Sequence, residues 1–251
     1  MSRMILKVSG RDAQSFLQGL VSNDVTRLAQ GPVYAAMLSP QGKYLADFLM
    51  IESDGAILID TAASHGPALL QRLSMYKLRA DVTLEQTDLR VSRGTGPAPH
   101  GALADPRHPA LGWRLYGATG GDDGSDWDAI RVAHCIPETG IELTPETYIL
   151  EAGFERLNGV DFRKGCYVGQ EVTARMKHKT TLKKGLVTLG LEGRAPVGTA
   201  IDSAGKPAGT LFTQSGARAI AHMRHDRIAA EMTAGDARLY PLAETPAPQP
   251  G

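Results

Sequence analysis

Apolar residues recur along the first part of the chain with two different spacings. Short apolar or alternating runs bounded by Gly, Ser, Asp or Pro predict strands, and apolar residues three or four positions apart predict helices. The expected strands are Met4–Val8, Tyr34–Leu38, Leu45–Ile51, Ala56–Asp60 and Asp81–Gln86, and the expected helices are Asp12–Leu20 and Gly66–Leu78. Helices placed between strands that can pair antiparallel predict an α+β unit rather than a doubly wound sheet.

The middle of the chain has a weaker pattern. Residues 94–126 are rich in Gly, Pro and Asp, which predicts loops interrupted by one short strand at Trp113–Tyr116. Helices are predicted at Trp127–Ala133 and Ile149–Leu157. A further helix is expected from Gln170 onward, with its positive charge towards the C-terminal end.

After Lys184 the pattern changes to short apolar runs separated by Gly-rich turns, which predicts a small antiparallel β-barrel. The runs are Gly185–Leu191, Ala200–Ile201, Gly209–Thr213 and Ala217–Met223. Residues 241–251 contain four prolines and are expected to form a disordered tail. We therefore expect an N-terminal α+β part at 1–90, a central α+β part at 91–184, the barrel at 185–240 and then the tail.

Composition narrows the class of protein. Lys plus Arg and Asp plus Glu both number 27, so no overall field attracts a polyanion, and direct nucleic-acid binding is not expected. Two cysteines without a C-x-x-C pair exclude a disulfide scaffold and a self-contained zinc site of the usual spacing. No apolar run reaches the length of a bilayer span, and the start reads as neither a signal nor a transit peptide. We expect a cytoplasmic protein without membrane contact.

The most specific local sequence is Lys164-Gly165-Cys166-Tyr167-Val168-Gly169-Gln170-Glu171, followed by Arg175. The two glycines permit a positive φ or a close approach of the backbone. A cysteine just before a helix and beside basic residues favours the thiolate, which is the form that attacks or binds metal. The alternative is a buried, inert cysteine in a tight turn. Glu171 and Arg175 also have the spacing of an ordinary helical ion pair.

This octapeptide with Arg175 resembles the signature of the YgfZ/IBA57 family, which are folate-binding relatives of the glycine-cleavage T-protein. Weaker similarities follow in the family's order over nearly the whole chain. They are Val8–Ala13, Phe16–Gly19, Asn23–Val25, Gly42–Lys43 with Asp47, Tyr76–Leu78, Gly209–Thr210 and Ala219–Ala221. The resemblance implies a T-protein-like, multi-domain α+β ring around a central channel, with mixed α/β N-terminal and central parts and a small C-terminal antiparallel β-barrel.

The resemblance also implies that the channel binds folate, as tetrahydrofolate or a derivative. Asn23 and Asp24 are the expected contacts to the pterin edge, and Trp127 is the expected stacking surface. Each has a structural alternative, which is turn or cap chemistry for the two polar residues and a core anchor for the tryptophan. Cys135 is expected in the core, and no partner set for a cysteine hydrolase can be placed.

By resemblance, the expected function is that of a folate-binding accessory factor for assembly or repair of iron–sulfur proteins, more a maturation factor than an enzyme. Cys166 would be a redox-active or cluster-contacting thiolate. No intrinsic metal site is expected, so any cluster would be shared with a partner, such as an A-type iron–sulfur carrier or a client enzyme. Two alternatives stay open. One is a tetrahydrofolate-dependent aminomethyl or C1 transferase, which is disfavoured because Ala46 replaces one of the T-protein's paired acidic residues. The other is a tRNA-modification factor acting through iron–sulfur enzymes.

Overall fold

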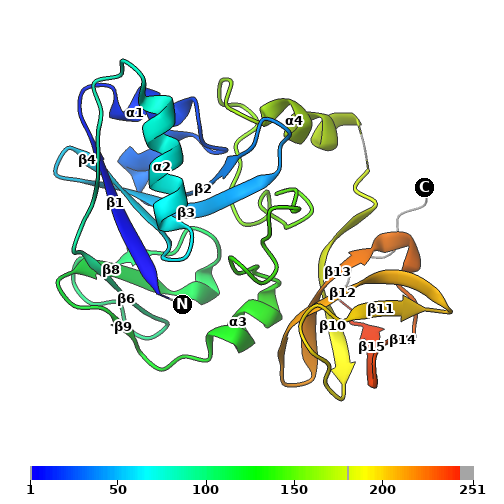
Figure 1. Ribbon diagram of the computed structural model, residues 1–251. Helices are drawn as coiled ribbons and strands as arrows, with labels where there is room; N and C mark the ends of the chain where they lie inside the picture. Colours follow the sequence, from blue (N-terminus) through cyan, green and yellow to red (C-terminus); the bar gives the residue numbers. More distant parts are fainter. Residues whose placement is uncertain (1, 180, 244–251) are drawn as a thin grey trace. The chain divides into compact units, whose positions relative to one another are not determined.

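The computed structural model describes residues 2–179 and 181–243 (Figure 1). The chain forms two compact units, and each is built from two separate stretches of sequence. The first unit contains Met1–Ser125 and Phe154–Ala174, and the second contains Asp126–Gly153 and Arg175–Gly251. The domains expected from the sequence are continuous stretches. That division stays a prediction, as does the arrangement of the parts in a ring.

An antiparallel five-stranded sheet in the order β2-β3-β4-β1-β5 organises the first unit. All five predicted strands and both predicted helices of this region are confirmed. The strands are β1 (Arg3–Ser9), β2 (Val33–Leu38), β3 (Tyr44–Ser53), β4 (Ala56–Ala62) and β5 (Thr83–Gln86), with the helices α1 (Ala13–Gln18) and α2 (Gly66–Lys77) and the 3-10 helix η1 (Val25–Gln30).

The two faces of this sheet carry different side chains, because successive residues of a strand point to opposite faces. Leu6, Phe48 and Ile59 belong to one hydrophobic core together with residues of α1 and α2. Figure 1 shows both helices lying against the strands. Asp47 and Asp60 alternate with these core residues and are also buried. The face opposite the helices therefore carries buried carboxylates, which need polar partners.

A second sheet contains three strands from the stretch 94–126, which was expected to be mostly loops, together with a fourth strand that ends at Gly94. It has the order β7-β8-β6-β9 and contains β6 (Arg90–Gly94), β7 (Leu103–Ala104), β8 (Trp113–Gly117) and β9 (Gly121–Asp122). Only β8 was predicted, so the expectation of one short strand is wrong. Two of the four strands are two residues long, which is too short for a sequence period to reveal. The 3-10 helix η2 (Pro109–Leu111) precedes β8.

The predicted helices α3 (Trp127–His134) and α4 (Gln170–Lys179) are confirmed. The helix predicted at Ile149–Leu157 is wrong, because this segment forms consecutive turns. Gly153 has a φ of 77°, which interrupts a right-handed helix. The chain also passes from the second unit to the first between Gly153 and Phe154, so the residues of this segment divide between the two units.

The second unit contains a closed six-stranded antiparallel barrel in the order β10-β13-β12-β11-β14-β15. Its strands are β10 (Lys184–Glu192), β11 (Ala200–Ser203), β12 (Lys206–Ser215), β13 (Arg218–Arg224), β14 (Met232–Ala234) and β15 (Ala237–Pro241), with the 3-10 helix η3 (His225–Arg227) after β13. The predicted barrel is confirmed, although β14 and β15 were not predicted. Pro241 ends β15, and residues 244–251 of the expected tail lie outside the described residues.

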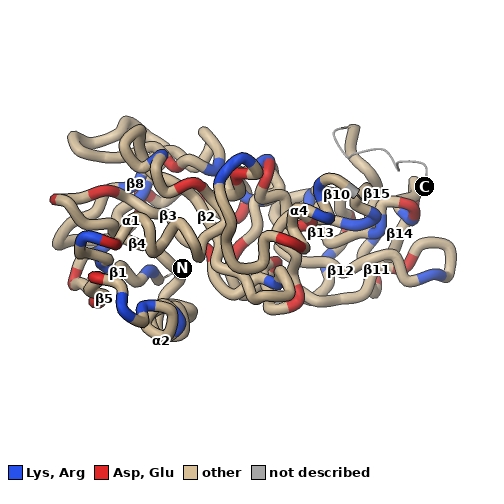
Figure 2. Tube along the Cα trace, turned by 90° about the horizontal axis from the view of Figure 1, so that it is seen from above, with Lys and Arg blue, Asp and Glu red and all other residues tan. Residues whose placement is uncertain are grey.

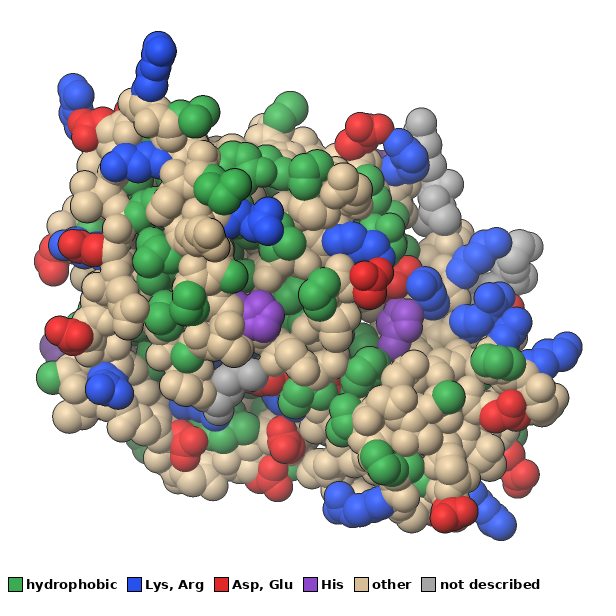
Figure 3. All heavy atoms as spheres, in the orientation of Figure 1, with side chains coloured by type: hydrophobic (Ala, Val, Ile, Leu, Met, Phe, Trp, Pro, Cys, Tyr) green, Lys and Arg blue, Asp and Glu red, His purple; other side chains and the backbone are tan. Residues whose placement is uncertain are grey.

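Charged residues of both signs are interspersed along the trace, in keeping with the balanced composition (Figure 2). Charged side chains of both signs lie around the edge of the visible barrel surface (Figure 3), while apolar side chains of the barrel strands form an enclosed core. Within the described part of the chain, no helix has both the length and the apolar character needed to cross a membrane.

Candidate functional site

Lys164 anchors the start of the cysteine motif to the first unit. Its side chain is buried, and its Nζ donates hydrogen bonds to the carbonyl oxygens of Gln18 (2.8 Å), Val21 (2.5 Å) and Asn23 (3.0 Å). An ammonium group has three donors and no acceptor. All of its hydrogen-bonding capacity is therefore used by the backbone of residues 18–23.

Burial shifts the pKa values of two motif side chains, Lys164 and Tyr167. Desolvation lowers the pKa of Lys164 to about 8, against the opposing effect of Asp24 and Asp161. Desolvation raises the pKa of Tyr167 to about 12, and a hydrogen bond with Thr173 acts in the opposite direction. Lys164 Nζ lies 4.9 Å from the centroid of the Tyr167 ring, within the range of a cation–π interaction. Both side chains are thus part of the interior.

Two glycines let the turn between β2 and β3 pack directly on the start of α4. Gly169 has a φ of 85° and Gly42 has a φ of 75°. A Cβ on Gly169 would lie 2.6 Å from the carbonyl oxygen of Ser39, and a Cβ on Gly42 would lie 2.8 Å from the Cβ of Val172. Only glycine fits both the backbone conformation and the space at these positions. Gly165 differs, because its φ is not positive and an added Cβ would meet nothing within 4 Å.

Cys166 is exposed between these anchored positions. On its C-terminal side, the N–H of Val168 donates to the carbonyl oxygen of Gly19 at 3.3 Å, and the N–H of Gln170 donates to that of Tyr167 at 3.2 Å. The loop is therefore held on both sides while the thiol lies at the surface. The alternative of a buried cysteine is wrong.

The remaining motif side chains lie on the exposed surface or close to it. The Gln170 side-chain amide donates to the carbonyl oxygen of Gly165 at 3.5 Å, at the limit of a hydrogen bond. Glu171 is exposed in the first turn of α4, where the helix dipole favours a negative charge. Arg175 is exposed one turn later and belongs to the second unit.

The segment 21–24, to which Lys164 donates hydrogen bonds, is itself hydrogen-bonded to the edge of the sheet. Ser22 exchanges hydrogen bonds with Ala36 of β2, donating its N–H at 2.9 Å and accepting at its Oγ at 2.8 Å. Val21 and Met37 form an isolated antiparallel bridge. Residues 21–24 thus cover the outer edge of β2, so the anchor point of Lys164 is part of a stable sheet.

Asn23 has a structural role in this covering segment. Its Nδ2 donates to the carbonyl oxygens of Tyr34 and Asn158, each at 2.7 Å, and its Oδ1 accepts from the N–H of Asp24 at 2.9 Å. The residue is 1% exposed. Both Nδ2 donors of Asn23 are engaged, so a pterin contact by its side chain, which stays a prediction, would have to replace one of these two bonds or use the second lone pair of Oδ1.

Asp24 caps the 3-10 helix η1, which confirms the cap alternative for this residue. Its Oδ1 accepts from the N–H and the hydroxyl of Thr26, at 3.0 and 2.8 Å, and from the Gln18 amide at 3.0 Å. Desolvation acts to raise the pKa of Asp24, but these hydrogen bonds and Lys164 lower it overall. The residue is partly exposed and anionic, so it could still accept a hydrogen bond from a ligand.

Asp47 lies on the face of the sheet opposite α1 and α2. Its carboxylate accepts hydrogen bonds from the hydroxyls of Tyr34 (3.0 Å) and Tyr44 (2.7 Å), and only 6% of the residue is exposed. Ala46 faces the other way, into the apolar core. A second acidic residue at position 46 would therefore lie among apolar side chains, away from Asp47.

A chain of buried charges escaped the sequence analysis. Asp60 accepts from Arg3 (2.6 Å) and Arg114 (3.0 Å), and Asp105 accepts from Arg114 (2.9 Å) and from two nitrogens of Arg107 (2.9 and 2.7 Å). Burial acts to raise the pKa of both carboxyl groups, but the arginines lower it overall. The network joins the two sheets of the first unit. An acidic residue inside the apolar run 56–62 was the available signal, because a buried charge needs a partner.

The second unit contains Trp127 and Cys135 at the two ends of α3. Trp127 is the first residue of this helix, is partly buried, and follows Asp126, whose side chain caps the helix. Cys135 ends the helix with a φ of 50° and is partly buried. The stacking role of Trp127 and its alternative as a core anchor both stay predictions, while Cys135 is partly buried and not, as expected, in the core.

A buried ion pair ties α3 to the barrel within the second unit. Arg131 donates to Glu142 at 3.1 Å and to the hydroxyl of Thr213 in β12 at 2.9 Å. Glu142 also accepts from the Thr213 hydroxyl at 2.5 Å. Arg131 and Glu142 are 5% and 3% exposed, so this cluster is part of the interior.

Two pockets of the first unit are lined in part by residues of η1. One has a volume of about 350 Å³ and is lined by residues that include Asn23, Arg27, Tyr34 and Asn158. It therefore lies beside one of the predicted folate contacts. Its cation, Arg27, is exposed and belongs to the last turn of η1.

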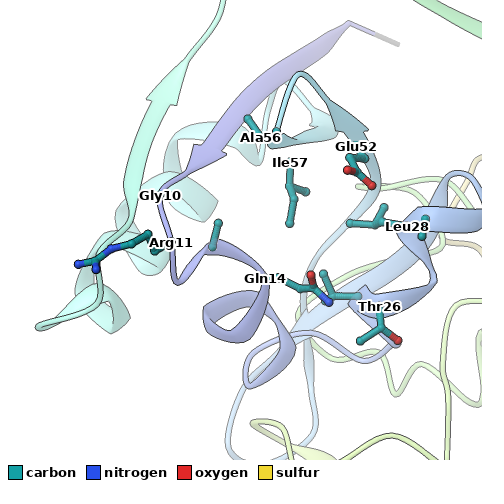
Figure 4. Close-up of a pocket in the computed structure, with 12 residues that line it drawn as sticks. Gly10, Arg11, Gln14, Thr26, Leu28, Glu52, Ala56 and Ile57 are labelled. Atoms are coloured by element: carbon teal, nitrogen blue, oxygen red, sulfur yellow. The ribbon is translucent and has the colours of Figure 1, made fainter.

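The other pocket has a volume of about 230 Å³ and is bounded by α1, η1 and the turn between β3 and β4 (Figure 4). Leu28 and Ile57 supply apolar surface, and Glu52 and Gln14 are exposed polar residues around it. Arg11 points away from this pocket and pairs with Asp81 at 2.6 Å. None of the predicted site residues lines it.

Comparison with known proteins places the chain in a family. Residues 183–249 match the model of the CAF17 C-terminal beta-barrel domain. The mitochondrial iron–sulfur cluster assembly factor IBA57 of Mus musculus is 31% identical over 90% of this chain and 76% of its own length. The chain belongs to the IBA57 family. The mitochondrial IBA57 homologue of Mycosarcoma maydis is 34% identical, and the match covers 74% of this chain and 55% of that protein. The chain thus spans about half the length of this fungal relative of the IBA57 family.

A solved structure confirms the predicted fold class. The glycine cleavage system aminomethyltransferase T of Bartonella henselae superposes with a TM-score of 0.76 over 96% of this chain and 83% of its own. At 13% identity this similarity concerns the fold alone. The two IBA57 relatives are named as mitochondrial proteins, while the cytoplasmic location expected for this chain stays a prediction.

Proposed function

We propose that this chain is an accessory factor for the assembly or repair of iron–sulfur proteins, and that Cys166 is its cluster-contacting or redox-active thiolate. The assembly role is supported by the names of the IBA57 relatives. The observation that carries the role of the cysteine is the construction of its loop. Hydrogen bonds and close glycine contacts fix the backbone on both sides, whereas the thiol is exposed.

The chemistry of a single thiolate limits what the site can do. Iron–sulfur clusters usually have four protein ligands, and Cys166 supplies one. The cluster is therefore cargo that is shared with a partner, which we propose to be an A-type iron–sulfur carrier or a client enzyme. A rigid loop would let the thiolate reach a cluster held by that partner without an added cost of ordering the loop.

An anaerobic mixing experiment tests this proposal. The purified chain is combined with a cluster-loaded A-type carrier, and the complex is followed by size-exclusion chromatography and by visible circular dichroism of the cluster. Cys166→Ser is compared with Cys135→Ser, which removes the other free cysteine. We expect wild type and Cys135→Ser to form a complex with an altered cluster spectrum and Cys166→Ser not to do so. An identical spectrum with Cys166→Ser would overturn the role of this thiol.

We further propose that the chain binds a reduced folate as a ligand that is not consumed. The support is the sequence resemblance, with Trp127 as a stacking surface and Asp24 as a partly exposed acceptor. Asn23 contributes to the pocket wall through its position, since its amide is engaged. Formation of methylene-tetrahydrofolate from an aminomethyl donor would instead favour the transferase alternative.

Binding of 5-formyltetrahydrofolate, measured by equilibrium dialysis, tests the folate proposal. Trp127→Leu is compared with Trp113→Leu at an equal folded fraction, because the chain has two tryptophans. Loss of the aromatic ring should weaken binding about fivefold in Trp127→Leu, since an aromatic contact contributes on the order of 1 kcal/mol. Trp113→Leu should bind as wild type does. Absence of saturable binding to wild type would contradict the folate proposal and leave the cluster proposal untouched.

A further inference from the structure

We propose that Lys164 is a positioning residue, which holds the Cys166 loop on the backbone of residues 18–23 and does not itself touch the cluster or its carrier. This inference rests on the proposed function and assigns a role to a motif residue that lies two positions from the thiol. It concerns how the loop is kept in one conformation.

The hydrogen bonds of Lys164 leave no donor for a ligand. Its three N–H groups are matched by three carbonyl oxygens at 2.5–3.0 Å, and the residue is 8% exposed. A lysine that binds an anionic substrate would need at least one donor directed to solvent. The neighbouring Arg163 is the contrasting case, because its side chain is 94% exposed and its nearest acidic group, Asp161, is 3.9 Å away.

The segment to which Lys164 is hydrogen-bonded is itself fixed on the sheet. The segment 21–24 covers the edge of β2 through Ser22 and through the bridge between Val21 and Met37. A carbonyl on this segment therefore has a defined position relative to the sheet. The hydrogen bonds of Lys164 to this segment therefore fix the start of the motif relative to the sheet.

A second attachment completes the constraint. Val168 donates to the carbonyl oxygen of Gly19, next to one of the carbonyls that Lys164 uses. The loop from 164 to 168 therefore starts and ends on the same short segment, and the two residues that follow Lys164, Gly165 and Cys166, are exposed. Loss of the lysine would move the N-terminal attachment of this loop back by three residues, to Asp161, whose N–H donates to the carbonyl oxygen of Ser22 at 3.1 Å.

The geometry also explains why the residue is lysine. Three carbonyl oxygens converge on one nitrogen atom, which suits the compact ammonium group with its three rotatable donors. A guanidinium group is planar and spreads its donors over three nitrogens, so it cannot make the same three bonds. Lys164→Arg should therefore fail to replace lysine even though it keeps the positive charge.

Hydrogen–deuterium exchange tests the anchor in the purified full chain. Lys164→Met and Lys164→Arg are compared with Arg163→Met, which removes a neighbouring exposed charge and leaves the anchor intact. We expect both Lys164 variants to exchange about tenfold faster in residues 18–24 and 164–169, as a local opening, while exchange in the barrel strands is unchanged. Arg163→Met should exchange as wild type does. If Lys164→Met fails to fold, Lys164→Arg supplies the comparison.

The same variants are then mixed with the cluster-loaded carrier under anaerobic conditions. A displaced thiolate should slow formation of the altered cluster spectrum by about tenfold to hundredfold at an equal folded fraction, with Arg163→Met unaffected. Unchanged exchange in the Lys164 variants would overturn the proposal, as would slower cluster chemistry with unchanged exchange, since the lysine would then act on the substrate directly. If Cys166→Ser behaves as wild type, the proposed function fails, and the exchange data still decide whether Lys164 anchors the loop.

Discussion

The two glycines of the cysteine motif should respond in opposite ways to the same substitution. Gly169→Ala places a methyl group where the backbone has a φ of 85° and where the Ser39 carbonyl oxygen would lie 2.6 Å away. Gly165→Ala places the same group at a position without positive φ and with nothing within 4 Å. The two glycines lie four residues apart in the same loop, so each variant is a matched control for the other.

The expected magnitudes follow from these two environments. A left-handed conformation costs an L-residue roughly 1–2 kcal/mol, and overpacking typically adds about 1–3 kcal/mol. A reduction in the entropy of the unfolded chain offsets about 0.4–1 kcal/mol of this. Gly169→Ala should therefore lose roughly 1–5 kcal/mol of unfolding free energy. Gly165→Ala should range from no change to a gain of about 1 kcal/mol.

Urea denaturation with circular dichroism measures these differences, and hydrogen exchange assigns them to the first unit. The relevant transition is the one in which peptides of β2, β3 and the motif lose protection. Equal stability of the two variants would refute the reasoning, because it would mean that the turn at Gly42 does not pack on Gly169. A large loss in Gly165→Ala would refute it as well.

Three further results are expected. Asp60→Asn leaves Arg3 and Arg114 facing a neutral, buried amide, so urea denaturation should show a loss of about 3–5 kcal/mol, and a loss below about 1 kcal/mol would contradict a buried role. Burial alone would raise the pKa of Asp60, but the arginines lower it overall. The ionised carboxylate therefore stabilises the wild-type fold above the unfolded pKa of about 4, and this stabilisation should be lost as the pH falls below that value. A wild-type unfolding free energy that does not change over this pH range would contradict the assignment. Glu142→Gln should lower the melting temperature of the second unit alone, because Arg131 then loses its buried carboxylate partner. Calorimetry combined with exchange labelling measures this, and earlier melting of the first unit would contradict the prediction.

Local patterns predicted most of the regular elements, because those elements contribute to one core. Apolar runs in β1 to β4 and helical spacing in α1 and α2 reflect this core. The hairpin between β3 and β4 was equally readable, since Asp54 and Gly55 adopt the positive φ values that this type of turn requires. Where one segment decides its own structure, sequence reasoning succeeded.

Elements that depend on distant partners were missed. The sheet of β6 to β9 consists of very short strands, and Arg114 within it is neutralised by Asp60 of the other sheet. The segment 149–157 has helical spacing, but Gly153 adopts a positive φ and the chain changes unit there. A partner 54 positions away produces no periodic pattern in the local sequence, and neither does a change of unit.

The candidate site shows the same division. The exposure of Cys166 agrees with the expectation of an accessible thiol, and Asp24 was correctly considered as a cap. The role of Lys164 could not be deduced, because its three acceptors are backbone carbonyls more than 140 positions away, and backbone groups carry no residue-specific signal. Gly169 needed the turn at Gly42 to be placed before its clearance could be understood.

The most direct test of the central claim is complementation in cells that lack this chain. The activity of a [4Fe–4S] dehydratase under oxidative stress is compared after expression of wild type, Cys166→Ala or Cys135→Ala at matched levels. The account predicts that wild type and Cys135→Ala restore the activity and that Cys166→Ala does not. Equal restoration by Cys166→Ala would contradict a functional thiolate, and failure of wild type would contradict the iron–sulfur role itself.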